Sequence, residues 1–244
     1  MYKKCCVVIP VYNDIPTENE NLSIITTIAK LSRFDLFIVA PNDLDIKYYQ
    51  EHYNCNVLRM DARVWRSKDR NKFPNYNRMM MSVGFYRKFD DYQYMLICQP
   101  DCLILKDGIE LESLCDMEYD YVGGVFCYNA GLQAAPRIWL YKKYPSLNTR
   151  EFFCGNGGLS LRKIKAVKKY IKMFKAFSAG EEDIFFMYFN RKWFRTADKI
   201  DAAKLSLNNT AIQYLCEGVY SPLGIHKWEE NFPDIIKGFQ CDGK

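Results

Sequence analysis

A few polar residues of this sequence have the types and the spacing that catalysis or metal binding needs. Asp101 follows Gln99 by two positions after an apolar run, and in an extended chain residues two apart point the same way. A carboxylate there could hold a divalent cation through oxygen or could cap a turn, and the residues alone favour neither. Glu182 and Asp183 stand at the start of a predicted helix, where one could act as a general base or both could simply complement the helix dipole.

A glycine-rich segment and a histidine complete the set of candidates. In residues 155–162 three glycines surround Asn156, which allows positive φ and close approach of the backbone to a ligand. The segment matches neither the dinucleotide-binding fingerprint nor a P-loop, so its glycine content slightly favours a tight structural turn. His226 is flanked by apolar residues, where a histidine is more often a satisfied core residue than a ligand.

The hydrophobic pattern predicts the elements that would position these residues. Short β-rich runs alternate with helical segments, an order typical of an α/β fold whose mixed, mostly parallel sheet is flanked by helices. In such folds ligands bind beyond the carboxyl ends of the strands. Thr17 and Glu20 have the spacing of a capping box at the start of the first helix. Strands are expected at residues 5–11, 34–40, 56–60, 92–98, 103–105 and 119–125, and further helices at 75–88 and 163–177.

Composition limits the class of protein. The 244 residues are 49% hydrophobic, with no linker or internal repeat, so a single domain over residues 1–244 is expected. Lys and Arg number 34 against 29 Asp and Glu, an excess too small to indicate a nucleic-acid partner but compatible with anionic ligands, and no nucleic-acid partner is expected. The 10 cysteines lie partly in strand-like runs, and no signal peptide or membrane span is evident. A reducing, cytoplasmic location is therefore predicted. Two histidines without a C-x-x-C pair argue against zinc.

The predicted helix at 163–177 is basic and amphipathic. Its apolar stripe is expected to pack on the sheet, as such stripes mostly do. The alternative is peripheral contact with an anionic membrane surface, at the inner face of the membrane.

The order of the motifs resembles that of nucleotide-sugar glycosyltransferases with the GT-A fold. Closest in pattern is a family catalogued as an uncharacterised glycosyltransferase-like domain. Its motifs are a Tyr-Asn helix, Gln-x-Asp, Gly-Asn-Gly-Gly-x-Ser-x-Arg, Glu-Asp and Gly-x-His-x-Trp. Each motif alone is weak, but five in this order, over nearly the whole chain, are specific. Here they are Tyr76-Asn77, Gln99-Pro100-Asp101, residues 155–162, Glu182-Asp183 and residues 224–228.

The resemblance implies roles for the candidate residues. GT-A enzymes use an Asp-x-Asp after this strand to bind Mn²⁺ or Mg²⁺, which clamps the donor diphosphate. Asp101 matches the second acid, and Gln99 replaces the first. His226 would complete the metal shell. Asp183 would deprotonate the acceptor hydroxyl in an inverting displacement, while Glu182 would orient the acceptor.

The resemblance also implies where the donor binds. The nucleoside would lie at the end of the first strand, with residues 1–125 binding the nucleotide sugar and residues 126–244 binding the acceptor. The expected donor-binding residues are Pro10, Val11, Tyr12, Asn77, Arg78, Gln99, Asp101, Asn156, Gly157, Gly158 and Lys227.

Further basic and aromatic residues have two interpretations each. Arg63, Arg66 and Arg70 lie in a polar loop, where they either stabilise the departing diphosphate or form a solvated surface. Tyr128 and Trp228 are the preferred candidates for stacking on a sugar ring, although protein cores also use aromatic residues.

The implied reaction moves a sugar from a nucleotide-diphosphate sugar, with a UDP-sugar expected first, to a hydroxyl of a glycan or lipid-linked acceptor. A role in building surface polysaccharide follows from the same resemblance. One alternative is a sugar-1-phosphate nucleotidyltransferase, although the glycine-rich signature of such enzymes is missing after the first strand. The other alternative is a non-catalytic module that binds nucleotide sugars or carbohydrates. It stays possible because Gln99 replaces the first metal-binding acid of the motif.

Overall fold

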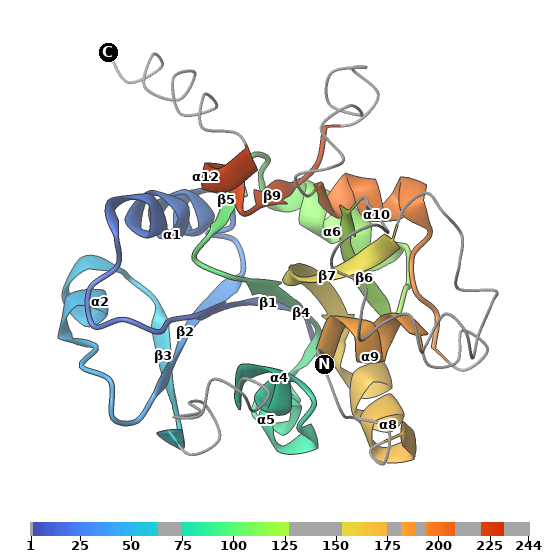
Figure 1. The fold of residues 1–244 in the computed structure, drawn as a ribbon, viewed down its shortest axis with the longest axis horizontal. Helices are drawn as coiled ribbons and strands as arrows, with labels where there is room; N and C mark the ends of the chain where they lie inside the picture. Colours follow the sequence, from blue (N-terminus) through green and yellow to red (C-terminus); the bar gives the residue numbers. More distant parts are fainter. Residues whose placement is uncertain are drawn as a thin grey trace, which may run out of the picture.

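The computed structural model describes residues 2–62, 75–126, 153–174, 182–188, 194–207 and 221–231, and the statements below concern these residues. Their strands form one nine-stranded mixed sheet in the order β3-β2-β1-β4-β7-β6-β8-β9-β5 (Figure 1). The predicted α/β class is confirmed, because helices cover both faces of this sheet.

The first four strands along the sheet are parallel to one another. They are β3 (Asn56–Met60), β2 (Asp35–Pro41), β1 (Lys3–Pro10) and β4 (Tyr92–Cys98). β1 and β4 are almost continuously buried, as strands covered by helices on both faces must be. The carboxyl ends of these strands therefore share one edge of the sheet.

The other half of the sheet contains the antiparallel pairs. β7 (Phe153–Lys163) runs antiparallel to β4 and to β6 (Tyr121–Phe126). β8 (Ser206–Leu207) and β9 (Gly224–His226) continue parallel to β6, and β5 (Cys102–Ile104) pairs antiparallel with β9. This arrangement brings a late segment of the chain beside the segment that follows β4.

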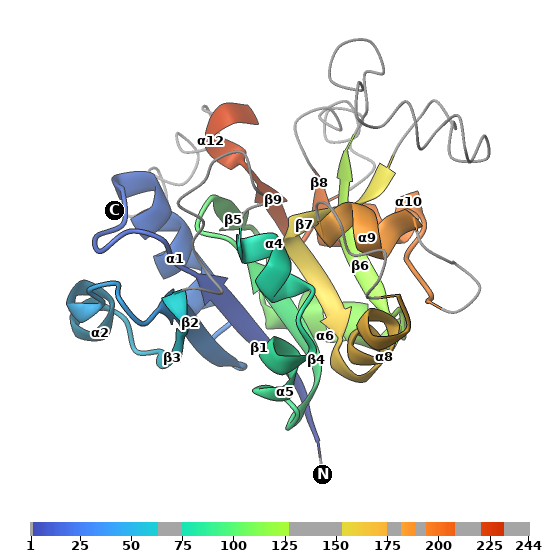
Figure 2. The same ribbon diagram turned by 60° about the horizontal axis from the view of Figure 1, so that its bottom comes forward.

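Two hydrophobic cores lie on opposite faces of the sheet. One contains buried side chains of α1, α6 and α10, and the other contains those of α4, α5, α8 and α9. Figure 1 shows the first set above the sheet and the second set below it, and Figure 2 shows the same layers from another side. The described helices are α1 (Glu18–Lys30), α2 (Lys47–His52), α4 (Asn75–Met80), α5 (Val83–Arg87), α6 (Gly108–Asp116), α8 (Ile164–Phe174), α9 (Glu182–Tyr188), α10 (Lys199–Leu205) and α12 (Trp228–Asn231).

The capping box predicted for the first helix is confirmed. Thr17 Oγ1 accepts a hydrogen bond from Glu20 N over 3.2 Å, and Thr17 N donates to Glu20 Oε2 over 2.8 Å. Two donors at the start of α1 are thus satisfied reciprocally.

The single helix predicted over residues 75–88 is wrong, because the structure has two short helices there. Met79, Met80 and Met81 are all buried, and three consecutive residues cannot share one face of a helix. The chain turns at Ser82, whose backbone is extended, and restarts as α5. The break lets the methionines reach the core.

α8 has the amphipathic character predicted for it. Its stripe of Ile164, Val167, Tyr170 and Ile171 is buried in the core below the sheet, so it is not available to a membrane surface. Within the described ranges, no helix is both long and apolar enough to cross a membrane.

Candidate active site

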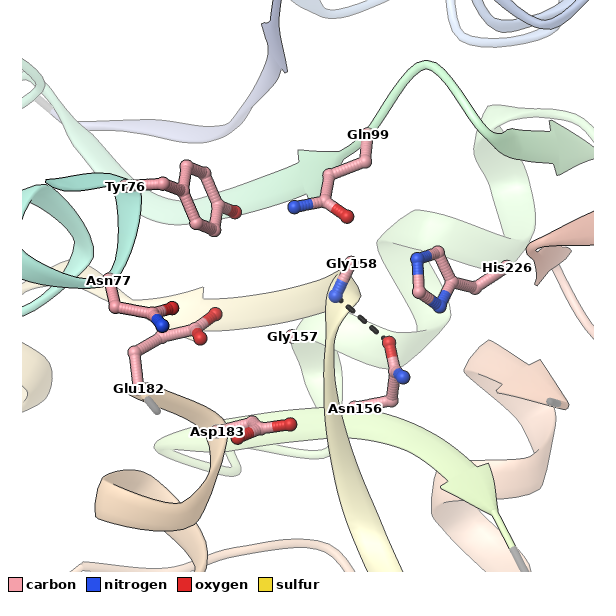
Figure 3. A pocket seen from close by; sticks show the side chains of 9 residues that line it. All are labelled: Tyr76, Asn77, Gln99, Asn156, Gly157, Gly158, Glu182, Asp183 and His226. Atoms are coloured by element: carbon pink, nitrogen blue, oxygen red, sulfur yellow. Dashed lines mark hydrogen bonds between the residues drawn. The ribbon is translucent and has the colours of Figure 1, made fainter. Parts of the chain in front are cut away.

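One pocket gathers side chains from five separate segments of the chain (Figure 3). It lies where β4 ends and is bordered by α4, β7, α9 and β9, in agreement with the rule that α/β sheets bind ligands beyond the carboxyl ends of their strands. Each of the five sequence motifs contributes to it. The lining residues are Tyr76, Asn77, Gln99, Asn156, Gly157, Gly158, Glu182, Asp183 and His226.

The turn after β4 positions Gln99 and Asp101. Gln99 N still donates to Gly158 O of β7 over 2.9 Å, and then Cys102 N donates to Gln99 O over 2.9 Å to close a turn around Pro100. Pro100 has no N–H, so regular pairing with β7 ends there. Gln99 lines the pocket, and Asp101, two residues further on, lies beside the lining residue His226.

Asp101 and His226 meet although 125 positions separate them. β9 pairs with β5 so that His226 is opposite Cys102, which places the imidazole beside the neighbouring carboxylate. His226 Nε2 and Asp101 Oδ2 are 3.3 Å apart. The imidazole is 5% exposed, and neither ring nitrogen makes a hydrogen bond to any residue that the structure describes. Among the described residues, His226 therefore lacks the hydrogen bonds of a satisfied core histidine, the alternative to a ligand that the sequence offered.

This pair fits a divalent cation. A buried imidazole whose nitrogens make no hydrogen bond to the described residues is costly unless a ligand occupies one of them, and the Asp101 carboxylate 3.3 Å from Nε2 supplies a second ligand atom. The Sγ of Cys102 belongs to the same cluster, within 4.8 Å of the other two ligand atoms. It donates to Gly158 O over 3.3 Å, and burial raises the pKa of this thiol well above its usual range. Asp101 and His226 are therefore the better ligands.

The two acids at the start of α9 differ in their surroundings. Glu182 is 5% exposed, and its Oε1 accepts a hydrogen bond from Arg162 of β7 over 3.0 Å. Asp183 is partly exposed and lines the pocket below Asn156 in the view of Figure 3. One carboxylate is thus held by a buried cation, while the other faces the pocket.

The glycine-rich segment lies within β7, so the expected tight turn is wrong. β6 pairs with it irregularly, because Gly123 is opposite Ser160 whereas Gly124 is opposite Asn156. The extra residues form a bulge, a feature that re-aims side chains next to active sites. Asn156 Oδ1 accepts a hydrogen bond from Gly158 N over 2.9 Å and fixes the bulge (Figure 3).

The residues predicted at the end of β1 divide into two groups. Pro10 and Val11 are buried, and Val11 has no exposed surface, so their side chains cannot form the predicted wall of a nucleoside site. They point into the core because β1 is covered on both faces. Tyr12 is 38% exposed, and its ring packs edge-on against Tyr76 with 6.2 Å between the centroids.

Three other predicted residues lie away from the pocket lining. Arg78 and Lys227 are exposed. The stacking role predicted for Trp228 is wrong, because the indole is fully buried and its Nε1 donates to Ser23 Oγ over 2.8 Å. A sugar cannot reach a ring enclosed between α1 and β9. Arg63, Arg66, Arg70 and Tyr128 lie outside the described residues.

Two lining or supporting residues had no role in the sequence analysis. The Tyr76 hydroxyl is buried without a hydrogen-bond partner among the described residues and points toward Gln99 in Figure 3. Arg162 has no exposed surface and lies behind Glu182. An arginine at the end of the run Leu159-Ser160-Leu161, which is typical of a strand, was the signal in the sequence that could have marked this site.

Comparisons with known proteins give a family and a fold. The family described as "Protein of unknown function (DUF5672)" matches residues 44–226. No curated protein sequence matches the chain.

Among solved structures, one match is galactosyltransferase LgtC in complex with donor and acceptor sugar analogs. The match covers 91% of this chain and 86% of the LgtC chain at 10% sequence identity, with a TM-score of 0.54. Mouse xyloside xylosyltransferase 1 matches 88% and 90% at 11% identity, with a TM-score of 0.53. The mannosyltransferase Ktr4p from S. cerevisiae matches 76% of this chain at 10% identity and a TM-score of 0.46, and only 62% of its own length is covered. The likeness to the first two shows that the chain has the GT-A fold.

Proposed function

The chain belongs to the family described as "Protein of unknown function (DUF5672)", and we propose that it is a glycosyltransferase acting on a nucleotide-diphosphate sugar. One observation carries the proposal. His226, which lies 3.3 Å from Asp101 of the first half of the sequence, lines the same pocket as the Glu182–Asp183 pair. A cation site beside a carboxylate pair is what sugar transfer from a diphosphate leaving group requires.

Asp101 and His226 would hold the cation, with Mn²⁺ favoured over Mg²⁺ because imidazole is a softer ligand than carboxylate. The bound cation would neutralise charge on the departing diphosphate. Gln99 carries no charge, so it suits contact with the donor's ribose or with a cation-bound water. Tyr12, Asn77 and the exposed Arg78 and Lys227 remain the predicted donor contacts, together with the bulge at 156–158.

Asp183 would take the proton from the acceptor hydroxyl while that oxygen attacks the anomeric carbon and the bond to the diphosphate breaks. This makes the reaction inverting. Glu182 has one oxygen engaged by Arg162, so it suits the holding of a second acceptor hydroxyl rather than proton transfer. Residues 1–125 would supply most of the donor site, joined by the bulge at 156–158, His226 and Lys227, and the rest of residues 126–244 would supply the acceptor site.

The acceptor would be a glycan or a lipid-linked sugar, as in the assembly of surface polysaccharide. Cys5, Cys6, Cys55, Cys98, Cys102 and Cys115 are free thiols, which supports the predicted reducing, cytoplasmic compartment.

Donor hydrolysis tests this proposal against its alternatives. Release of nucleoside diphosphate would be measured from a panel of UDP- and GDP-sugars with Mn²⁺, for the wild type and for Asp101→Ala. We expect release by the wild type and a loss of at least about 100-fold in the variant. Pyrophosphate-dependent formation of a nucleoside triphosphate would instead identify a nucleotidyltransferase, and donor binding without turnover would identify a non-catalytic module.

A further inference from the structure

Arg162 is the last residue of the glycine-rich motif at 155–162, yet it has no direct role in the proposed reaction. Its guanidinium donates to Tyr86 Oη over 2.8 Å, to Ser160 Oγ over 3.0 Å and to Glu182 Oε1 over 3.0 Å. Ser160 Oγ in turn donates to Gly157 O over 2.9 Å. The spacing of Gly, Ser and Arg in the motif thus builds one hydrogen-bonded unit that ends on the carboxylate in the pocket.

Two aromatic rings that stack on each other lie beside the guanidinium of Arg162. The rings of Tyr121 and Phe186 lie 5.5 and 5.4 Å from its Cζ, a separation at which aromatic rings attract a cation. The side chain has no exposed surface. Arg162 is therefore held rigidly and cannot itself reach a ligand in the pocket.

Stability alone does not explain this buried ion pair. Removing two charges from water costs free energy that their mutual attraction only offsets, and apolar pairs of similar size often serve equally well. The ion pair does hold the Glu182 carboxylate in one position beside the pocket. Oε1 is occupied by Arg162, and among the described residues Oε2 has no hydrogen-bond partner, so it is left for a ligand.

We propose that Arg162 is a positioning residue that acts through Glu182 to orient the sugar acceptor. The inference rests on the proposed function, since it requires an acceptor hydroxyl that donates to Glu182. A free glutamate side chain would sample several rotamers, whereas a charge-assisted bond from a rigid guanidinium selects one. Lysine would keep the charge but lose the planar fork that also contacts Tyr86 and Ser160.

A double-mutant cycle tests the proposal. Arg162→Lys, Glu182→Gln and the double variant would be assayed for transfer from the active nucleotide sugar to a panel of methyl glycosides, with KM measured for donor and acceptor separately. We expect each single variant to lower kcat/KM for the glycoside by about 100-fold. The donor KM should stay within about twofold, and the double variant should be no worse than Glu182→Gln, because residues that act as one unit are not additive.

The matched control is Arg87→Lys, at an exposed arginine of α5, which should change neither KM. Multiplicative losses in the double variant, or a rise in donor KM equal to that for the acceptor, would overturn the inference and leave the proposed function standing. Absence of transfer by the wild type would overturn both.

Folding of Arg162→Lys would be checked by its melting temperature. If Arg162→Lys does not fold, the double variant Arg162→Gln/Glu182→Gln, which replaces the ion pair by two neutral amides, is assayed in its place and compared with Glu182→Gln alone. An acceptor kcat/KM in the folded double variant within about twofold of that of Glu182→Gln alone would support the inference, and a further multiplicative loss would overturn it.

Discussion

The imidazole of His226 lies against the backbone of Gly158, so closely that a Cβ at this position would overlap the ring. The adjacent Gly157 has the same relation to the carboxylate of Glu182. Neither glycine has the positive φ that the sequence analysis allowed for. The two glycines instead leave space on β7 for one side chain from β9 and one from α9, which explains why they stand side by side.

Gly158→Ala should therefore weaken cation binding, because the added methyl group displaces the imidazole from Asp101. Losses of about 10- to 100-fold in affinity are typical when the orientation of a metal ligand is disturbed. Titration calorimetry with Mn²⁺ would measure the change. Gly84→Ala is the control, since Gly84 is exposed and its Cβ would lie an ordinary 3.4 Å from Ser82 Oγ. Unchanged Mn²⁺ affinity in Gly158→Ala would argue against His226 as a ligand.

Removal of divalent cations should suppress turnover. We expect EDTA to abolish release of nucleoside diphosphate and Mn²⁺ to restore it, because no described cationic side chain lines the pocket to neutralise the leaving group. His226→Gln should require at least about tenfold more Mn²⁺ for half-maximal rate. The chain's other histidine, His52, is exposed and stacks on Tyr48, so His52→Gln is the matched control. Full activity in EDTA would show that Asp101 and His226 have another purpose.

The parallel half of the fold could be predicted because its central strands, β1 and β4, are almost continuously buried. The run at residues 92–98 is apolar except for the exposed Gln93, and β4 begins and ends at the predicted residues. Short strands could not be found in this way. β8 has two residues and β9 three, too few for any pattern to register, and both are defined only by their partners across the sheet. The antiparallel course of β7 was missed because its glycines resemble a turn.

The part of the site that follows β4 was also predictable, because this strand is evident in the sequence. Gln99 and Asp101 follow a clear strand, so the rule about strand ends locates them without any structure. The proximity of His226 depends on the pairing of β5 with β9, which local sequence does not encode. Trp228 was misassigned because a large aromatic residue near a motif can face a ligand or the core, and only the hydrogen bond to Ser23 decides between them.

Trp228→Phe should lower stability and leave donor binding unchanged. The substitution removes the bond from Nε1 and leaves the buried Ser23 hydroxyl without this donor, at a cost of about 1–3 kcal/mol in the free energy of unfolding. Urea unfolding would measure it. Ser23→Ala removes the same bond from the other side, so the loss in the double variant should be smaller than the sum of the single losses. If Trp228→Phe weakened donor binding without changing the free energy of unfolding, Trp228 would instead have the stacking role.

Asp183→Asn should abolish transfer while the donor still binds. The amide has the size of the carboxylate but cannot accept the acceptor's proton, and removing a general base typically costs about 10²- to 10⁴-fold in rate. Turnover would be measured at saturating donor, and nucleoside diphosphate affinity by calorimetry. Asp116→Asn is the control, because Asp116 is exposed and pairs with Lys4 at 2.8 Å, outside the pocket lining. Normal turnover with weakened donor affinity would assign Asp183 to the donor site and would overturn its role as the general base.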